Sequence, residues 1–344
     1  MDMKNVELNK QEIQELPQVI KVGLLGFGTI GSGVFTVLNN ERELITRRLY
    51  KAIGRHVEIQ ITKVLVLPDE YPPGLPTELR VTDYNEILND ASIDIVVELI
   101  GGLNPATNFM IQAMEKGKHV VTANKYAIFT AQGALEAKAD ETDVHLRYEA
   151  AVGGAIPILR SINEGLIGDQ IESVVGILNG STNYILTGVK NGKTLEEALA
   201  EAKQNGYLEA DPSADLEGYD AMHKLGILGY LITGQYPAAS SIEREGIEKI
   251  TAEDIENAKL NGQAYKLVAR ATKNADGEFT YSVKPEALNP DHPLYHTEGV
   301  LNTILITSKY AKELVFTGYG AGSLETATAV TGDIVSIARD LHIC

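Results

Sequence analysis

The turn Gly26-Phe-Gly28-Thr-Ile-Gly31 constrains the fold more than any other stretch of this sequence. It directly follows an apolar run over residues 19–25 that predicts a buried strand, and residues 32–49 after it predict a helix. In that setting the first glycine permits the tight turn, and the second lets the backbone approach a pyrophosphate. The third lets helix and strand pack closely, and the helix N-terminus attracts the phosphate charge. The stretch therefore favours a dinucleotide-binding turn over a glycine-rich turn of some other α/β protein.

Strand-like and helix-like runs continue to alternate as far as residue 148. Further strands are expected over residues 57–67, 93–99, 119–122 and 144–148, and helices over residues 83–89, 105–116 and 126–140. This alternation with short loops predicts an α/β domain with a Rossmann-type, doubly wound parallel sheet. Ligands of such sheets bind beyond the carboxyl ends of the strands, where residues 26–31, 100–102 and 123–125 would lie.

The second half of the chain predicts a different kind of domain. After a glycine-rich hinge over residues 149–157, expected strands and helices are interspersed in an α+β pattern. A second glycine loop at residues 318–323 precedes a last expected helix over residues 327–341, so two glycine loops could face one cofactor from two sides. The predicted organisation is a polar leader (1–18), a dinucleotide-binding domain (19–148), a substrate-binding and dimerisation domain (149–323) and a C-terminal helix returning toward the nucleotide domain (324–344).

Composition excludes several classes of partner. The 30 basic and 47 acidic residues give a net charge of −17, which does not suit a nucleic-acid backbone or an anionic membrane. Cys344 is the single cysteine, so no intramolecular disulfide can form, and no Cys/His cluster has zinc spacing. The N-terminus lacks the basic and apolar regions of a signal peptide, and no apolar run reaches ~18 residues. A cytoplasmic protein without nucleic-acid or membrane partners is expected.

The stretch from Gly206 to Lys224 is the candidate catalytic region. A helix is expected to start at Asp215 and to run to about residue 233, with Asp220 and Lys224 on one face. The pair could be an exposed ion pair, worth ~0.3–0.5 kcal/mol. However, residues 225–232 carry no charge, which indicates a buried helix and a lysine partly withdrawn from water, suited to proton transfer. Nearby acids suit a small substrate with an amine and a carbonyl; they are Glu209, Asp211 and Asp215.

Two questions about the nucleotide half stay open. Lys125 follows a strand end and precedes a helix, so it is either a solvated residue of a loop capped by Asn124 or a residue directed into the cofactor cleft. The cofactor's ribose is usually fixed at the end of the second strand, by an acid for NAD or by a basic group for NADP. Residues 64–70 there offer no arginine and only Asp69 nearby, so the choice between NAD and NADP remains open.

Taken together, these motifs resemble the homoserine dehydrogenase family over about residues 19–338. The most specific part is Ala202 to Lys224, which is similar to the family signature A-x3-G … D-P-x2-D … G-x-D-x3-K. Further matching blocks follow in the family's order at residues 26–31, 97–102, 121–125, 149–157 and 176–186. The resemblance implies a monofunctional short form that reversibly converts L-aspartate 4-semialdehyde to L-homoserine with NAD or NADP, in threonine and methionine biosynthesis. It also implies a homodimer.

The resemblance assigns roles to individual residues. Lys224 would donate the proton to the carbonyl oxygen, and Asp220 would help hold that end of the substrate. Glu209 and Lys125 would also bind the substrate. The residues implied to bind the cofactor are Gly26, Phe27, Gly28, Thr29, Ile30, Gly31, Gly101, Lys125 and Gly322. The residues implied to hold a monovalent cation (sodium or potassium) are Glu149 and, through main-chain oxygens, Val152, Gly154 and Ile156. Oxygen ligands of this kind suit a hard cation.

Three positions depart from the family pattern. Leu208 replaces a small residue, Leu67 replaces an arginine of many bacterial members, and Glu325 replaces a frequent proline. The end at Cys344 leaves no room for an ACT domain or a fused aspartokinase, so no strong threonine inhibition through such a domain is expected. Another NAD(P)-dependent amino-acid dehydrogenase and a non-catalytic dinucleotide sensor are the alternatives. Aspartate-semialdehyde dehydrogenase is disfavoured, because its thiol nucleophile could only be Cys344.

Overall fold

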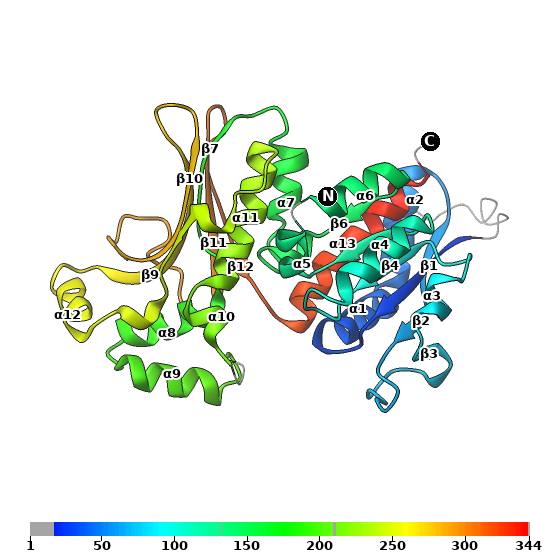
Figure 1. The fold of residues 1–344 in the computed structure, drawn as a ribbon, viewed down its shortest axis with the longest axis horizontal. Coiled ribbons are helices and arrows are strands. Elements are labelled where there is room, and N and C mark those ends of the chain that lie inside the picture. Colours follow the sequence, from blue (N-terminus) through cyan, green and yellow to red (C-terminus); the bar gives the residue numbers. More distant parts are fainter. Residues whose placement is uncertain (1–16, 132, 209–210, 343–344) are drawn as a thin grey trace, which may run out of the picture.

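The structure is a computed structural model that describes residues 17–131, 133–208 and 211–342. Most of the expected polar leader, together with Glu209 and Cys344, lies outside the described residues. The chain forms two bodies side by side, each built on one six-stranded sheet (Figure 1). Within the described ranges, no helix combines the length and the apolar character needed to cross a membrane.

The first body is a Rossmann-type parallel sheet with helices on both faces, as expected. Its strands, in spatial order, are β3 (Arg80–Val81), β2 (Val57–Leu65), β1 (Gln18–Leu25), β4 (Ile95–Glu98), β5 (His119–Thr122) and β6 (Leu146–Arg147). Its helices are α1 (Thr29–Asn40), α2 (Arg42–Ile53), α3 (Asn85–Leu88), α4 (Ala106–Glu115), α5 (Lys125–Thr130) and α6 (Ala134–Thr142). The single helices expected over residues 32–49 and 126–140 were wrong, because each is broken into two.

Strand register aligns the carboxyl ends of the central strands. Leu25 of β1 lies opposite Leu65 of β2 and opposite Glu98 of β4, and Glu98 lies opposite Thr122 of β5. The stretches that follow these strands, residues 26–31, 99–102 and 123–125, therefore meet at one edge of the sheet. This confirms the sequence prediction for that edge and places the ligand side of the first body.

The second body is a mixed sheet with helices packed on it. Its strands, in spatial order, are β12 (Lys312–Tyr319), β11 (Leu301–Ser308), β7 (Ile171–Ile177), β9 (Ala264–Lys273), β10 (Phe279–Leu288) and β8 (Ile242–Arg244). Its helices are α8 (Gly180–Lys190), α9 (Leu195–Gln204), α10 (Ser213–Leu216), α11 (Tyr219–Thr233) and α12 (Ala252–Leu260). Edge strand β12 was missed, because it is largely exposed and shows only a weak apolar alternation.

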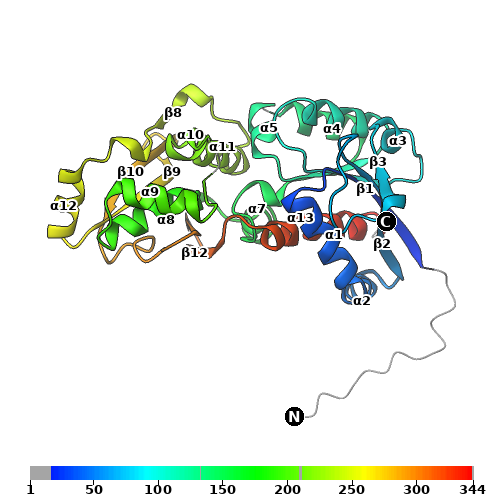
Figure 2. The same ribbon diagram turned by 90° about the horizontal axis from the view of Figure 1, so that it is seen from below.

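The two bodies are tied together by the hinge and by the last helix. The hinge contains a 3-10 turn (Glu149–Ala151), the short helix α7 (Ile158–Arg160) and a π-helical turn (Ser161–Gly165). Helix α13 (Ser323–Asp340) starts directly after β12 and returns to pack on α1 of the first body (Figure 2). One apolar core runs from Val120 in the first sheet through Val152 in the hinge to Leu225 and Ile304 in the second body.

Candidate active site

The stretch 206–224 folds differently from the expectation that one helix starts at Asp215. Two helices form, α10 and α11, because Gly218 between them adopts a left-handed conformation with φ of 82°. Asp215 does not cap a helix, and its carboxylate instead accepts a hydrogen bond from Asn179. Helix α11 ends at Thr233 as expected, where Gly234 is again left-handed.

Asp220 and Lys224 form a buried ion pair on α11. The Lys224 Nζ atom lies 2.7 Å from Asp220 Oδ2 and donates a second hydrogen bond of 2.7 Å to the carbonyl oxygen of Leu178. Only 8% of Asp220 and 7% of Lys224 is exposed. The interpretation as an exposed surface pair was therefore wrong, and the lysine is withdrawn from water as the charge-free run after it indicated.

Lys125 joins this pair from the other body. It starts α5, whose first turn is capped by the Asn124 side chain, and its Nζ lies 3.0 Å from Asp220 Oδ1. Its side chain is 37% exposed, so it lies at the open end of the cluster. Asp220 thus binds one ammonium group with each carboxylate oxygen, and the two lysines come from opposite bodies.

The two carboxyl groups of the cluster have opposite electrostatic environments. Burial raises the pKa of Asp220, but the charges of Lys224 and Lys125 outweigh it and hold the pKa well below its ordinary value. Burial raises the pKa of Asp215, and the neighbouring negative charge of Asp220 raises it further. Asp220 is therefore a permanent anion, whereas Asp215 would gain most from a cationic ligand.

Asn179 organises the cluster, and the sequence analysis missed this role. Its side-chain oxygen caps α8 through Thr182 N, and its Nδ2 donates to Asp215 Oδ1 at 2.7 Å and to Asp220 Oδ2 at 3.0 Å. The available signal was the Asn-Gly-Ser-Thr turn at a strand end, within the family block at residues 176–186. Asn179 thereby fixes both carboxylates from the first turn of α8.

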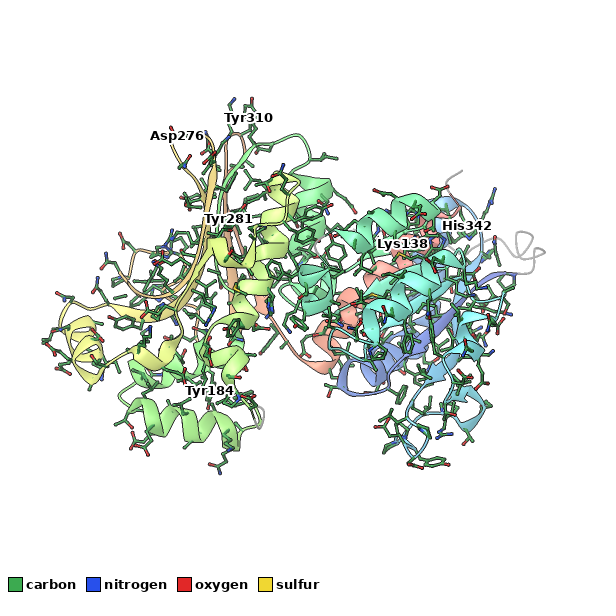
Figure 3. All side chains as sticks on the ribbon, in the orientation of Figure 1. Lys138, Tyr184, Asp276, Tyr281, Tyr310 and His342 are labelled. Carbon is green, nitrogen blue, oxygen red and sulfur yellow. The ribbon has the colours of Figure 1, made fainter. Side chains whose placement is uncertain are left out.

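The loop toward Glu209 is anchored on the same helix. Ser181 Oγ donates to the carbonyl oxygen of Tyr207 at 2.7 Å, and the Tyr207 ring lies 4.7 Å from that of Tyr184, which is labelled in Figure 3. Leu208, the departure from the family signature, is buried in the main core. Glu209 itself is outside the described residues, but the residues before it are held beside the first turn of α8.

The glycine turn after β1 has the geometry that a dinucleotide needs. Gly26 has a positive φ of 96°, and a Cβ on Gly31 would lie 2.3 Å from the carbonyl oxygen of Gly26. A Cβ on Gly28 would meet no atom within 4 Å, so this glycine leaves open space before the N-terminus of α1. Thr29 and Ile30 begin that helix, and the mostly buried Phe27 packs against Phe35. The turn therefore fits a pyrophosphate.

A buried carboxylate organises the next turn along the same edge. Glu98 Oε1 accepts the backbone N–H groups of Ile100 at 2.8 Å and Gly101 at 3.0 Å, while Oε2 accepts the Thr122 hydroxyl at 2.7 Å. Asn124 adds a bond of 2.7 Å to the carbonyl oxygen of Gly102. This network positions the left-handed Gly101 and the start of α5. A single acid inside the apolar strand was the signal for it in the sequence.

The second glycine loop lies against the first. Ser323 Oγ donates to the carbonyl oxygen of Thr29 at 2.6 Å, and a Cβ on Gly33 of α1 would come within 2.6 Å of the Ser323 carbonyl oxygen. Gly322 caps α13 with φ of 134°, and Glu325 lies in the first turn of that helix. The helix entry is therefore intact with glutamate in place of the family's proline.

Arg80 lies at the strand end where the ribose of a cofactor would lie. Its guanidinium donates to the carbonyl oxygens of Glu70 at 2.9 Å and Leu67 at 3.4 Å, and it stacks 4.3 Å from the Tyr71 ring centroid. From the sequence, a basic group was expected only at the end of the second strand, within residues 64–70. The missing information was the pairing of β3 with β2, which places Arg80 beside Val64.

The residues that resemble a cation site lie in the hinge. The Glu149 carboxylate is already bound by the backbone N–H groups of Leu159 at 2.9 Å and Arg160 at 2.8 Å. The Ile156 carbonyl oxygen accepts Ile158 N, whereas those of Val152 and Gly154 receive no hydrogen bond from the described residues. Among the same residues, no group of three or more His, Cys, Asp or Glu side chains could hold a metal. Main-chain oxygens are thus the ligands that the hinge provides for a cation.

A cavity of about 730 Å³ opens beside the cluster. Its lining includes Lys125, Tyr126, Asp215, Asp220 and His223. A separate cavity of about 510 Å³, lined by Arg147, Arg160 and Asp333, lies at the hinge. The first cavity adjoins the lysine–carboxylate cluster and is large enough for a small polar substrate.

A dinucleotide-binding Rossmann sheet whose ligand edge meets a buried lysine–carboxylate cluster on a second domain defines the class of nicotinamide-dependent oxidoreductases. The family model for the NAD-binding domain of homoserine dehydrogenase matches residues 26–149. The family model for homoserine dehydrogenase matches residues 157–335. The chain therefore belongs to the homoserine dehydrogenase family.

Individual relatives agree with this assignment. The homoserine dehydrogenase of Synechocystis is 41% identical over 322 residues, which cover 92% of this chain and 73% of the relative. The crystal structure of a homoserine dehydrogenase from Thiobacillus denitrificans has a TM-score of 0.89 and 37% identity, covering 94% of this chain and 74% of that one. A hyperthermophilic archaeal homoserine dehydrogenase in complex with NADPH has a TM-score of 0.76 and 27% identity, with coverage of 94% and 98%.

Proposed function

We propose that this protein catalyses the reversible, NAD(P)-dependent conversion of L-aspartate 4-semialdehyde to L-homoserine. The observation that carries the proposal is the buried Asp220 carboxylate, bound by Lys224 of the second body and Lys125 of the nucleotide body. This cluster lies where the dinucleotide edge of the first sheet meets the second domain. A carbonyl placed there would have a proton donor on one side and the cofactor on the other.

Lys224 is the proposed proton donor. A lysine ammonium group has three N–H donors. Two of those on Lys224 point to Asp220 Oδ2 and to the Leu178 carbonyl oxygen. The third remains for the oxygen of the substrate. A bound nicotinamide dinucleotide supplies the hydride for reduction and accepts it for oxidation. Lys224 protonates the alkoxide that develops during reduction, and it receives that proton again during oxidation.

The remaining polar groups suit the amino-acid part of the substrate. We assign Lys125, at the open end of the cluster, to the reacting end of the substrate together with Asp220. Glu209 and Asp215 supply negative charge for the substrate ammonium group, and the raised pKa of Asp215 means that a cation beside it would be favourable. Glu209 keeps the role implied by the family signature as a prediction.

NADP is the cofactor that we expect this protein to prefer. Arg80 lies beside the end of β2, where a basic group recognises the 2′-phosphate. A direct comparison of NAD and NADP at equal concentrations tests the preference, and a lower KM for NAD would contradict it.

A monovalent cation in the hinge is a further proposal. The carbonyl oxygens of Val152 and Gly154 receive no hydrogen bond from the residues that the structure describes and suit a hard cation, whereas the Glu149 carboxylate accepts backbone N–H groups of α7. The positive φ values of Gly153 and Gly154 shape this turn. Sodium or potassium chloride should raise the melting temperature more than choline chloride of the same ionic strength, and equal effects would contradict the site.

A cytoplasmic homodimer is the expected assembly. Edge strand β12 exposes Val315 and Tyr319, each about half accessible, beside the hinge-proximal end of the second sheet. A partner subunit that covers this edge would bury both side chains. Light scattering during size-exclusion chromatography tests the assembly, and a mass near 37.3 kDa would contradict it.

The deciding experiment is the oxidation of L-homoserine with NAD and NADP side by side. Turnover with either cofactor supports the proposed reaction. A screen of aspartate semialdehyde against other aldehydes and oxo acids separates it from another amino-acid dehydrogenase. Tight dinucleotide binding without turnover of any of these substrates would favour the non-catalytic sensor and contradict the enzyme.

A further inference from the structure

Asn302 is buried with both polar atoms of its side chain unpaired. It lies near the start of β11 with no exposed surface. In the part of the chain that the structure describes, neither Oδ1 nor Nδ2 has a hydrogen-bond partner, and no other side chain there leaves two buried polar atoms unpaired. An unpaired buried amide costs free energy that an apolar side chain of similar size would avoid. Such a buried group calls for a hydrogen-bond partner other than the described residues.

The Asn302 side chain lies close to the backbone at two glycines. A Cβ on Gly320 would lie 1.9 Å from Oδ1 and 2.7 Å from Nδ2, and a Cβ on Gly180 would lie 3.6 Å from Oδ1. Gly180 starts the helix whose cap, Asn179, holds Asp220. Gly320 belongs to the Gly-Ala-Gly loop 320–322 that leads to Ser323 and its contact with Thr29. The amide therefore lies where the substrate helix meets the cofactor loop.

Strand register places Asn302 near the residue whose carbonyl oxygen binds Lys224. Thr303 of β11 lies opposite Ile177 of β7, so one further step along the same antiparallel ladder brings Asn302 opposite Leu178. The carbonyl oxygen of Leu178 is the one that accepts Lys224 Nζ. Asn302 also shares a strand face with Ile304, which belongs to the core between the two bodies. Its side chain thus points to the interdomain side of the sheet.

The chemistry of a free amide selects its ligand. One acceptor and two N–H donors in a plane match another primary carboxamide through two hydrogen bonds. The substrate ammonium group could use only Oδ1 and its carboxylate only Nδ2, which would leave the other atom unpaired. The nicotinamide ring carries a primary carboxamide, and the ring must lie near Lys224 because hydride and proton reach the same carbonyl group.

We propose that Asn302 is a positioning residue for the cofactor, and that its side-chain amide pairs with the nicotinamide carboxamide when the cofactor is bound. This inference rests on the proposed function. Access requires the loop 320–322 to move away from the amide, and a loop of two glycines and one alanine has no large side chain to obstruct that movement. Pairing at this point fixes which face of the nicotinamide ring is turned toward the substrate.

The test compares the preferred cofactor, NADP+ or NAD+, with its 3-acetylpyridine analogue, in which a methyl group replaces the carboxamide nitrogen. Dissociation constants are measured by calorimetry without substrate. The wild type should bind the analogue about tenfold more weakly, as expected for the loss of one hydrogen bond. Asn302→Leu should bind the natural cofactor about tenfold more weakly and discriminate little between the two. Ile304→Val, a packing change on the same strand face, should keep the wild-type ratio.

Two further readouts keep the outcome decisive. Asn302→Leu should melt no lower than the wild type, because it removes two unpaired atoms, and Asn302→Ala gives the same titration if the leucine variant fails to fold. With a stereospecifically deuterated reduced cofactor, the variant should lose strict selectivity for one hydrogen. If Asn302→Leu weakens binding of the natural cofactor and of the analogue equally, so that the ratio of their dissociation constants stays as in the wild type, the proposed role of Asn302 is wrong. Cofactor binding without homoserine turnover would instead contradict only the proposed function.

Discussion

Replacement of Lys224 by alanine tests the proton-transfer step most directly. Loss of a general acid lowers kcat by about 10²–10⁴-fold, which corresponds to ~2.7–5.4 kcal/mol of transition-state stabilisation. Stability should change less, because Asp220 keeps Lys125 at 3.0 Å and Asn179 at 3.0 Å after the substitution. Removing one partner of a buried ion pair costs about 3–5 kcal/mol when the other charge is left uncompensated, and the two partners that Asp220 keeps lower that cost.

The assay measures kcat for L-homoserine oxidation, the dissociation constant of the cofactor and the melting temperature of each variant. Lys224→Arg is the informative companion, because arginine keeps the positive charge next to Asp220 but does not release its proton in proteins. It should be nearly as slow as Lys224→Ala while restoring much of the stability. Lys138→Ala is the matched control: Lys138, labelled in Figure 3, forms a pair with Glu141 three residues on but lies on the surface of α6. The control should leave kcat unchanged.

The refuting result is specific. If Lys224→Ala folds, binds the cofactor as the wild type does and keeps kcat within about threefold, Lys224 is not the proton donor, because that loss is far below the general-acid range. If Lys224→Arg keeps wild-type kcat, the site needs the charge of the lysine and not its proton.

Three further predictions follow from separate parts of the structure. Gly28→Ala should have the melting temperature of the wild type, since its Cβ meets open space, but it should lose dinucleotide affinity, since that space is where the cofactor would bind. Gly31→Ala should lower the melting temperature, since its Cβ would lie 2.3 Å from the Gly26 carbonyl oxygen. Equal melting temperatures of the two variants would contradict this difference. Arg80→Gln should raise KM for NADP about tenfold, the loss of one charged contact, and leave KM for NAD nearly unchanged; a parallel rise of both would contradict 2′-phosphate recognition. Burial lowers the pKa of Lys266 from 10.5 to about 8, so the unfolded chain binds more protons and stability rises between those pH values; denaturant titrations of the wild type should show a rise of about 3 kcal/mol that is absent in Lys266→Met.

Local sequence patterns were sufficient for most of the nucleotide half. The apolar run before Gly26 and the glycine spacing together predicted β1, the turn and the parallel sheet, and the structure confirmed the shared edge of three strand ends. These features depend on residues close in sequence, namely strand periodicity and the backbone freedom of glycine. The end of α11 at Thr233 was predictable for the same reason, because Gly234 follows it.

The features that were missed depend on contacts between distant segments. Arg80 reaches the end of β2 only because β3 pairs beside it, and Asn179 reaches Asp220 across 41 positions of sequence. The break at Gly218 was hidden by an otherwise continuous helical pattern on both sides. Neither propensity nor spacing encodes such tertiary pairings, so the sequence indicated candidate catalytic residues but not the residues that hold them in place.

The arrangement around Asp220 links the chemistry to the joining of the two bodies. A carboxylate that is 8% exposed is unfavourable without compensating charge, and its two ammonium partners come from different bodies. If the bodies separate, Lys125 moves away and Asp220 keeps only Lys224 and Asn179 as partners. The negative charge of Asp220 is then less compensated, so it binds the Lys224 ammonium group more tightly. If they close, Lys125 shares the carboxylate charge, and the proton transfer proposed for Lys224 is easier. The same carboxylate would therefore favour that proposed step only when the nucleotide-binding body is in place.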